Sequence, residues 1–486
     1  WDQCGYDSAI IRRTLGSTDN SVYYEIPVNS FSQISAGTGG EGAAGTGGEG
    51  AAGTGGEGAA GTGGEGAAGT GGEGAAGTGG EGAAGTAVGN IFYCRNPFAV
   101  ADRLFGRHTR CFRGSFISPN IRRAEDGGVI EEFVLKTGWP EATIDPELDS
   151  RDEVRILQRI NEKLRQNDRF KNMYPNIVCG GRVQLDIDGV QRQDSTDLLL
   201  AAMNVDVPQH RVHKRLITQP IGKQLSNAGS VLELIAVLVD VMTVHTEIFK
   251  ECQILHRDIS ISNTLVWRDT DESARGMLID FDLALPTDQV DLPAGYKRTG
   301  TLPFMSINNL EENSNQRTSL DDWEAFLAVV CWIGTFGWQE VDARNDPALT
   351  SDDRPIMKWR EGSRITIAAA KRGHFDSTVE FYDKIVKHFK EGPGSNDMKL
   401  LACLLRDCLF ESSVVSDSDA HGTTLKKPSG GGRRIDYSQP FVPPVKIDPF
   451  QVRVQHAEAI CDRALHEMRE FLTAVKDRSA AAATAP

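Results

Sequence analysis

The chain has 486 residues, 40% of them hydrophobic, and a formal net charge of −15. This length is enough for two or three domains. The acidic balance argues against a nucleic-acid partner, because phosphate binding needs clustered Lys and Arg. No apolar run approaches the roughly 18 residues that a membrane-spanning helix needs, so we expect no membrane partner either.

Nine cysteines are scattered along the chain, and no two of them stand at CxxC spacing. This pattern favours reduced, mostly buried thiols over a disulfide framework or a metal site. We therefore expect an intracellular protein, located in the cytoplasm or the nucleus.

The N-terminal part contains a repeat that cannot form a packed core. Residues 1–36 show no clear period and are left unassigned, as the remnant of a preceding element. Residues 37–84 are six copies of GTGGEGAA, a unit that is half glycine and has no large apolar side chain. Stacking such units would bury nothing, and ordering them would cost much conformational entropy. The segment 37–86 is thus predicted to be a disordered linker.

The rest of the chain divides into a strand-rich part and a helix-rich part. Residues 87–229 alternate short apolar runs with turns, whereas residues 230–478 are mostly helical in pattern. This order predicts an α+β fold with two lobes, of which the smaller is rich in strands and the larger is helical. A C-terminal helix is expected at Gln455–Lys476, followed by a disordered tail at 479–486.

A lysine and a glutamate stand at informative places in the strand-rich part. The run Glu132–Lys136 is typical of a buried strand, and it ends in a lysine. A helix follows from Asp152, with Glu153 in its first turn and apolar residues at positions 154, 157, 160 and 164. That spacing places the apolar residues on one face of the helix.

The strongest chemical signal lies in the helix-rich part. An apolar run leads into His256-Arg257-Asp258, and Asn263 follows after four more residues. Further along, a second apolar run ends in Asp280. Phosphoryl transfer needs a carboxylate that orients the attacking hydroxyl and takes its proton, and oxygen ligands that hold magnesium. Asp258 suits the first role, Asn263 and Asp280 suit the second, and a two-stranded turn between Thr264 and Asp280 would bring them together.

Several stretches of the chain resemble one known family. The runs HRDISISN, LIDFDLA, RTGTLPFMS and SLDDWEAF resemble the fungal-type protein kinases, a divergent branch of the eukaryotic protein kinase fold. The resemblance covers roughly residues 100–375. It implies a two-lobed kinase fold, ATP and Mg²⁺ as cofactors, and protein substrates whose Ser or Thr hydroxyls accept the phosphate.

The resemblance also implies roles for single residues. Lys136 would contact the α- and β-phosphates of ATP, and Glu153 would be its partner. Thr301, in a peptide-positioning segment at Gly300–Met305, would form a hydrogen bond near Asp258. Asp321 would brace the main chain of the catalytic loop.

Two further assignments concern loops. Arg257 is expected to bind a phosphate on the activation segment, where Thr299 is our choice among the hydroxyls of Tyr296, Thr299 and Thr301. A phosphate-covering loop is expected at Leu104–Phe112, where Gly106 matches the family and His108 stands in the place of a second glycine. Gly106 would let the main chain approach the phosphates closely.

Three residues depart from the kinase pattern. Asp282 replaces the glycine of Asp-Phe-Gly, and Ser260 replaces a lysine that contacts the γ-phosphate. Asn308 replaces a glutamate that normally forms a buried ion pair with an arginine. Because an arginine left without its partner is costly when buried, we expect a loosened activation segment.

These departures leave alternatives open. The leading interpretation is an active protein kinase, and the second is a pseudokinase that serves as a binding scaffold. The third is a small-molecule phosphotransferase of the aminoglycoside-kinase type. Enzymes of that type usually lack the arginine after the histidine and a segment like Gly300–Met305, and both are present here. The protein substrate and the oligomeric state stay open.

Overall fold

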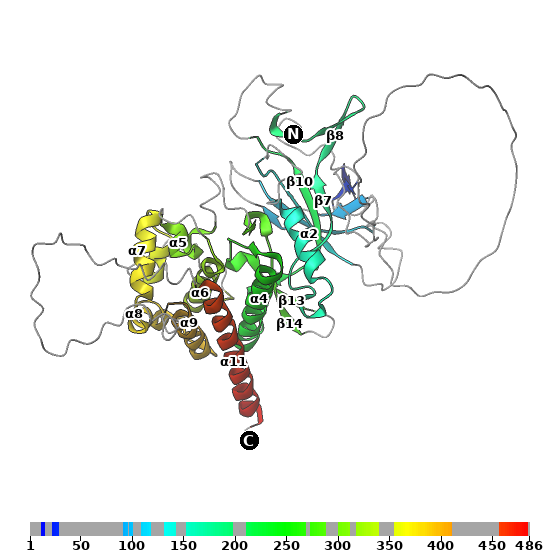
Figure 1. Cartoon of the computed structure of the whole chain (residues 1–486). Coiled ribbons are helices and arrows are strands. Elements are labelled where there is room, and N and C mark those ends of the chain that lie inside the picture. Colours follow the sequence, from blue (N-terminus) through cyan, green and yellow to red (C-terminus); the bar gives the residue numbers. More distant parts are fainter. Residues whose placement is uncertain are drawn as a thin grey trace, which may run out of the picture.

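The computed structural model places the strands on one side of the molecule and most helices on the other (Figure 1). The predicted linker at 37–86 and the single residues Gly106, Tyr296 and Thr299 lie outside the residues that it describes. The described residues are 11–14, 22–28, 91–95, 97–100, 108–117, 131–141, 152–197, 210–268, 273–287, 300–311, 317–339, 354–410 and 456–484.

An antiparallel sheet in the order β1-β2-β3-β5-β6-β10-β7 forms the strand-rich part, and β4 pairs with β5 beside it. In β6, alternate residues are buried, so that Leu135 lies in the core while Lys136 points to the opposite face. This confirms the strand expected around Lys136. The strands are β1 (Ile11–Thr14), β2 (Val22–Pro27), β3 (Ile91–Cys94), β4 (Ala99–Val100), β5 (Arg110–Ser115), β6 (Phe133–Gly138), β7 (Asn176–Arg182) and β10 (Lys214–Gln219).

Two strands of this sheet come from the residues that the sequence left unassigned. β2 pairs with β3, and β1 extends the sheet beyond β2. Ile26 of β2 is completely buried and belongs to the same hydrophobic cluster as Phe92 of β3. The N-terminal segment therefore contributes to the core of the strand-rich part.

Helix α2 (Glu153–Leu164) packs against β7 and connects the sheet to the helical part. Asp152 caps it, because its side chain accepts a hydrogen bond from the main-chain N–H of Val154. The apolar positions of the predicted face, Val154, Leu157, Ile160 and Leu164, are all buried.

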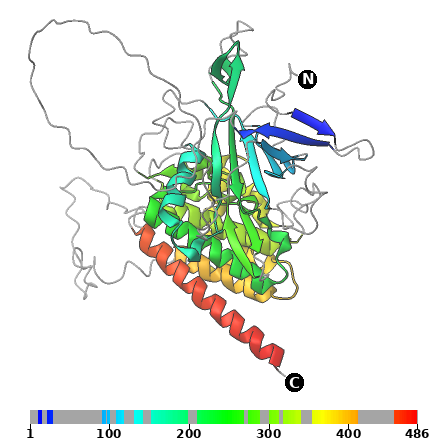
Figure 2. The same ribbon diagram turned by 90° about the vertical axis from the view of Figure 1, so that its right-hand side faces the viewer.

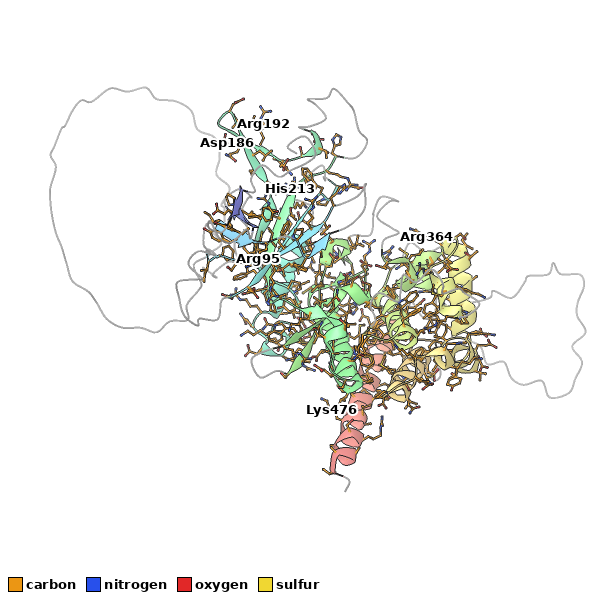
Figure 3. All side chains as sticks on the ribbon, turned by 180° about the vertical axis from the view of Figure 1, so that it is seen from behind. Arg95, Asp186, Arg192, His213, Arg364 and Lys476 are labelled. Atoms are coloured by element: carbon orange, nitrogen blue, oxygen red, sulfur yellow. The ribbon has the colours of Figure 1, made fainter. Side chains whose placement is uncertain are left out.

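A hairpin of β8 (Gln184–Ile187) and β9 (Val190–Gln193) projects from this sheet (Figure 2). Asp186 Oδ1 accepts a hydrogen bond from the N–H of Gly189, whose φ of +79° suits glycine at the turn. Figure 3 labels Asp186 and Arg192 on this hairpin, well away from the helical part.

Helix α6 (Ser319–Phe336) forms the centre of the helical part, and all of its residues are buried. Helices α4 (Val231–Cys252), α9 (Ser395–Phe410) and α11 (Ala457–Thr484) pack around it. None of the helices in the described ranges combines the length and the hydrophobicity that a membrane span requires. The other helices here are α5 (Ile307–Leu310), α7 (Arg364–Phe375) and α8 (Thr378–Lys384).

Short strand pairs flank the loop at residues 256–263. β13 (Thr264–Arg268) pairs with β14 (Ala274–Leu278), and β11 (Lys223–Gln224) with β13. β12 (Ile254–Leu255) pairs with β15 (Leu285–Pro286). The N–H of Ile279 donates to the carbonyl oxygen of Asn263 at 3.0 Å. The two-stranded turn expected from the sequence is thus present.

The C-terminal helix α11 (Ala457–Thr484) runs beyond the predicted end. Its buried residues extend to Val475, and from Lys476, labelled in Figure 3, its side chains are exposed. The disordered tail predicted from residue 479 is wrong as far as Thr484. The alanines at 480–483 explain the difference, because Ala has the highest helix propensity and needs no tertiary contact to stay helical.

Candidate active site

A lysine from the sheet meets a glutamate from α2. Lys136 Nζ lies 2.9 Å from Glu153 Oε1 and 2.8 Å from Glu153 Oε2. Because Glu153 is the first residue of α2, the position of this helix sets the position of the ion pair. The contact expected from the sequence is therefore formed.

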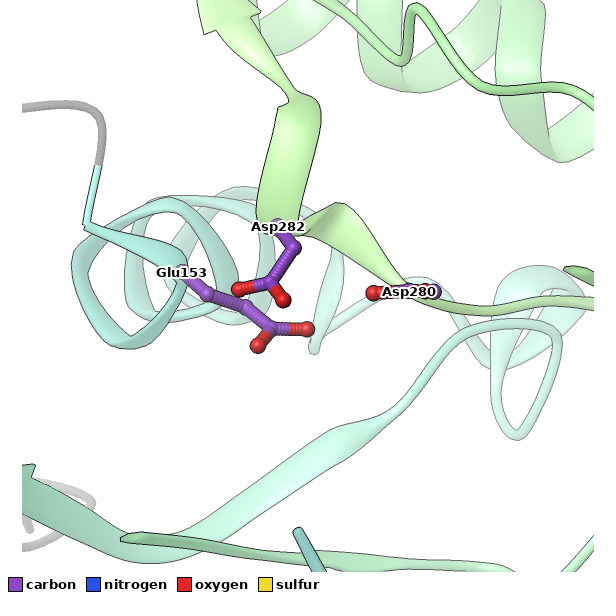
Figure 4. A group of neighbouring side chains, drawn as sticks. All are labelled: Glu153, Asp280 and Asp282. Atoms are coloured by element: carbon purple, nitrogen blue, oxygen red, sulfur yellow. The ribbon is translucent and has the colours of Figure 1, made fainter. Parts of the chain in front are cut away.

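Two more carboxylates reach the same ammonium group. Lys136 Nζ lies 2.6 Å from Asp280 Oδ1 and 3.2 Å from Asp282 Oδ2. Figure 4 shows the carboxylates of Glu153 and Asp282 facing one another, with Asp280 beside them. We call these four residues the phosphate cluster. Its acidic side chains are 12% to 38% exposed, so solvent and ligands can reach them.

The charges of the phosphate cluster do not balance. Burial pushes the pKa of Lys136 down, but Asp280, Asp282 and Glu153 outweigh burial and hold that pKa well above its ordinary value. Burial and the neighbouring Asp282 raise the pKa of Glu153 well above its usual range, although Lys136 opposes them. One cation thus faces an excess of negative charge.

The sequence noted Asp282 only as the residue that replaces a glycine. The left-handed main-chain angle of this turn falls on Asp280, with φ +67°, whereas Asp282 lies within the 3₁₀ helix η6 (Phe281–Leu283). The conformational freedom of glycine is therefore not needed at position 282. The contact between the Asp282 carboxylate and Lys136 was not expected from the sequence.

The Asp258 carboxylate is held from two sides. Its Oδ1 accepts hydrogen bonds from the N–H and the Oγ1 of Thr301, both at 2.8 Å. The amide nitrogen of Asn263 donates to the main-chain oxygen of Asp258 at 2.9 Å and to its Oδ2 at 3.2 Å. These contacts unite Asp258, Asn263 and Thr301, as the sequence predicted.

The donor set suits a hard divalent cation. One carboxylate oxygen each from Glu153, Asp280 and Asp282 lies within 4.8 Å of the others. The amide group of Asn263 uses its nitrogen toward Asp258, which leaves its oxygen for another partner. Carboxylate and amide oxygens are the ligands that Mg²⁺ prefers. Asn263 and Asp280 are therefore chemically suited to the metal role.

Asp322, and not Asp321, braces the main chain of the loop at residues 256–263. The N–H groups of His256 and Arg257 donate to the two Asp322 oxygens, each at 2.9 Å, and His245 Nε2 lies 2.9 Å from Oδ2. Hydrogen bonds and charges from His245 and His256 lower the pKa of Asp322 in spite of its burial. Adjacent helix residues point about 100° apart, so the sequence alone did not fix which aspartate faces the loop.

Gly300 lets the peptide-positioning segment pass close to the catalytic loop. Its φ is +128°, and a Cβ atom there would stand 3.1 Å from the carbonyl oxygen of Arg257. Arg257 is itself buried, with φ +69°. The Arg257 phosphate partner stays a prediction, since Thr299 lies outside the described residues.

Two positions differ from the kinase pattern in ways that the structure makes concrete. Ser260 is completely buried, and its Oγ lies 3.0 Å from Ser262 Oγ. It therefore does not take over the function of the lysine that other kinases have at this position. His108 adopts a left-handed φ of +47°, a conformation that glycine would adopt without strain. Gly106 lies outside the described residues, and its role stays a prediction.

Comparison with protein families agrees with this geometry. The model of the fungal protein kinases matches residues 84–334, just over half of the chain. The chain therefore belongs to the fungal protein kinase family, which confirms the resemblance found in the sequence. A search of the curated proteins found no match.

Proposed function

We propose that this chain is an ATP- and Mg²⁺-dependent protein kinase that transfers the γ-phosphate to Ser or Thr hydroxyls of proteins. We further propose that its strand-rich and helical parts act as the two lobes around the site. The arrangement of Asp258 with Asn263 and Thr301, beside the phosphate cluster, is the observation that carries the proposal.

Asp258 is the base in this proposal. Thr301 holds its Oδ1, and Asn263 lies against its Oδ2, so the carboxylate has one fixed orientation. It accepts the proton of the substrate hydroxyl while the hydroxyl oxygen bonds to the γ-phosphorus. The bond between that phosphorus and the bridging oxygen of ADP breaks in the same transfer. Fixing the carboxylate in advance lowers the entropic cost of this step.

Lys136 supplies positive charge for the α- and β-phosphates, and Glu153 fixes its direction. For this, Lys136 has to exchange its contact with Asp280 for a phosphate oxygen. Asp280 and Asn263 would hold Mg²⁺, which neutralises phosphate charge when it is bound. The short distance between Lys136 and Asp280 supports a site where both groups serve one ligand.

A pseudokinase is the second candidate. It is favoured by the replacement of a lysine by Ser260, a buried residue that offers no cation to the γ-phosphate, and by the excess negative charge around Lys136. A small-molecule phosphotransferase is less well supported, because Thr301 of the peptide-positioning segment contacts Asp258 directly.

The test is transfer of the γ-phosphate from Mg-ATP to a panel of Ser, Thr and Tyr peptides. The Asp258→Asn variant keeps the shape of the side chain but removes the base, so transfer should fall by about 10²-fold or more. Asp186→Asn on the distant hairpin is the matched control and should retain full activity. Transfer that is equal in wild type and Asp258→Asn would reject the proposal, and no transfer by either would favour the pseudokinase.

A further inference from the structure

A second group of buried polar side chains lies under residues 305–308, beyond the candidate active site. Lys371 on α7 donates from Nζ to the carbonyl oxygen of Met305 at 2.6 Å. Glu324 on α6 accepts the N–H of Ile307 at 2.6 Å. The two side chains therefore hold the main chain of this segment from two different helices.

Both charged residues are withdrawn from solvent. Lys371 is 0% exposed and Glu324 is 2% exposed. The Lys371 ammonium also stands 5.0 Å from the ring centre of Trp359, a favourable cation–π distance. Buried charges are kept in a fold only where opposite charges and hydrogen bonds offset their desolvation. The contacts of Lys371 and Glu324 with the main chain therefore have to offset the desolvation of both charges.

Asp321 completes the group from the same side as Glu324. Its Oδ1 accepts a hydrogen bond from Ser306 Oγ at 2.6 Å and one from Asn308 Nδ2 at 3.1 Å. Each residue from Met305 to Asn308 is thus bound by a buried side chain of α6 or α7. We call Asp321, Glu324 and Lys371 the anchor.

The anchor supports the segment at the position where other kinases have a glutamate and this chain has Asn308. The sequence predicted a loosened segment, because Asn308 cannot form the ion pair of other kinases. In this structure the opposite charges sit on α6 and α7 and bind the main chain of the segment instead. Arg406, buried on α9, donates to the carbonyl oxygens of Phe375 and Asp376 and so is not left without partners.

A continuous path of hydrogen bonds joins the anchor to the candidate base. Lys371 binds the oxygen of Met305, and the N–H of Met305 donates to the oxygen of Thr301 at 3.2 Å. Thr301 Oγ1 in turn donates to Asp258. A shift of Met305 would therefore displace Thr301, the residue that fixes the Asp258 carboxylate.

We propose that Lys371 and Glu324 are positioning residues for the protein substrate, which act through Met305, Ile307 and Thr301. This inference rests on the proposed kinase function. The contacts seen for these two side chains in the described part of the chain go to Met305, Trp359 and Ile307, none of which belongs to the phosphate cluster. Their loss should therefore weaken the use of a peptide substrate and leave the nucleotide site unchanged.

The test compares Lys371→Met, Lys371→Arg and the control Lys387→Met, which removes an exposed lysine that pairs with Asp383 one turn away. Lys371→Met should raise the KM for a peptide substrate about tenfold and leave the KM for ATP unchanged, because one buried hydrogen bond to Met305 is lost. Amide exchange in residues 301–308 should become faster. Lys371→Arg keeps the charge and the donors, and it should recover part of the peptide affinity.

A merely structural role would give a different pattern. If Lys371→Met lowers the melting temperature but leaves peptide KM and exchange in 301–308 as in wild type, the inference is wrong. Should that variant not fold, Glu324→Gln replaces it, since it removes the charge and keeps an oxygen for Ile307. Amide exchange needs no activity: if wild type transfers no phosphate, the proposed function fails, while exchange still decides whether the anchor holds the segment.

Discussion

Lys136 and Lys371 both lie among carboxylates, yet their surroundings differ. Lys136 faces three carboxylates whose side chains are partly exposed, between 12% and 38%. Lys371 is completely buried and has Glu324 as its main charged neighbour. The first lysine has three carboxylates around it and an open side, whereas the second is closed off from solvent and has one main charged neighbour.

The pKa values of the two lysines move in opposite directions for this reason. At Lys136 the carboxylates outweigh burial and keep the pKa well above its ordinary value. At Lys371 burial outweighs Glu324 and lowers the pKa to about 8. An accessible excess of negative charge suits the binding of ions, and a buried side chain that is bonded to the main chain suits the fixing of a segment. The comparison therefore distinguishes the proposed nucleotide site from the proposed anchor.

The largest effects are expected when either lysine is replaced by methionine. Lys136→Met should lower kcat/KM by about 10²-fold or more, since the positive charge on the phosphates is lost. It should also weaken the binding of ADP, measured by calorimetric titration. Lys371→Met should leave ADP binding at the wild-type value.

The control for this pair of variants is Lys387→Met, which removes an exposed lysine that belongs to neither group. Equal ADP affinity in Lys136→Met and wild type would remove Lys136 from the nucleotide site. A large loss of ADP affinity in Lys371→Met would show that the two groups are not separate.

Part of the phosphate cluster could be predicted, because Lys136 and Glu153 belong to regular elements and Asp280 follows an apolar strand, whereas the contact of Asp282 could not. Asp258 and Asn263 of the neighbouring loop stand five residues apart in one motif. Lys136 lies within β6 and Glu153 begins α2, two elements that the periodicity of the sequence identifies. For such residues local order along the chain determines their position in space.

The anchor could not be predicted, because its parts come from distant helices. Lys371 and Glu324 come together only through tertiary packing. Glu324 stands in the run SLDDWEAF, but the resemblance implied no role for it, and Lys371 stands in no motif. One signal was available: Lys371 shares the apolar face of α7 with Ile367 and Phe375, at intervals of four residues. The pairing of β2 with β3 was hidden likewise, since the repeat at 37–84 separates the two strands in sequence.

A smaller change tests the excess charge of the phosphate cluster. Asp282→Asn removes one negative charge beside Lys136 and keeps the size of the side chain. Nucleotide affinity should rise and Mg²⁺ affinity should fall, each by about three- to tenfold, because one charge acts on ligands of opposite sign. Calorimetric titrations of ADP and of Mg²⁺, done separately, measure both constants.

The prediction for Asp282→Asn depends on the affinities for ADP and for Mg²⁺ changing in opposite directions. A variant that merely loosens the turn would weaken both ligands together, and that outcome would contradict the electrostatic account of Asp282. Asp186→Asn, on the hairpin away from the helical part, controls for the loss of one acidic charge from the whole protein.

The smallest effect expected is a pH dependence of stability that comes from the anchor. The pKa of Lys371 in the folded chain is about 8, below the ordinary value of about 10.4 for an unfolded lysine. Between these values the unfolded chain binds more protons than the folded one, so stability rises with pH. The free energy of unfolding of wild type, relative to Lys371→Met, should increase by about 1 kcal/mol between about pH 7 and about pH 9.

Urea denaturation of both proteins at each pH measures this difference. Groups that Lys371 does not influence cancel between the two chains. The Cys331 thiol is not among them: burial raises its pKa well above its ordinary value, and the charge of Lys371 opposes that rise. A difference that stays flat with pH would mean that Lys371 keeps its proton in the folded chain throughout this range. Lys371 would then have the same charge state as Lys136, and the two lysines would differ in exposure alone.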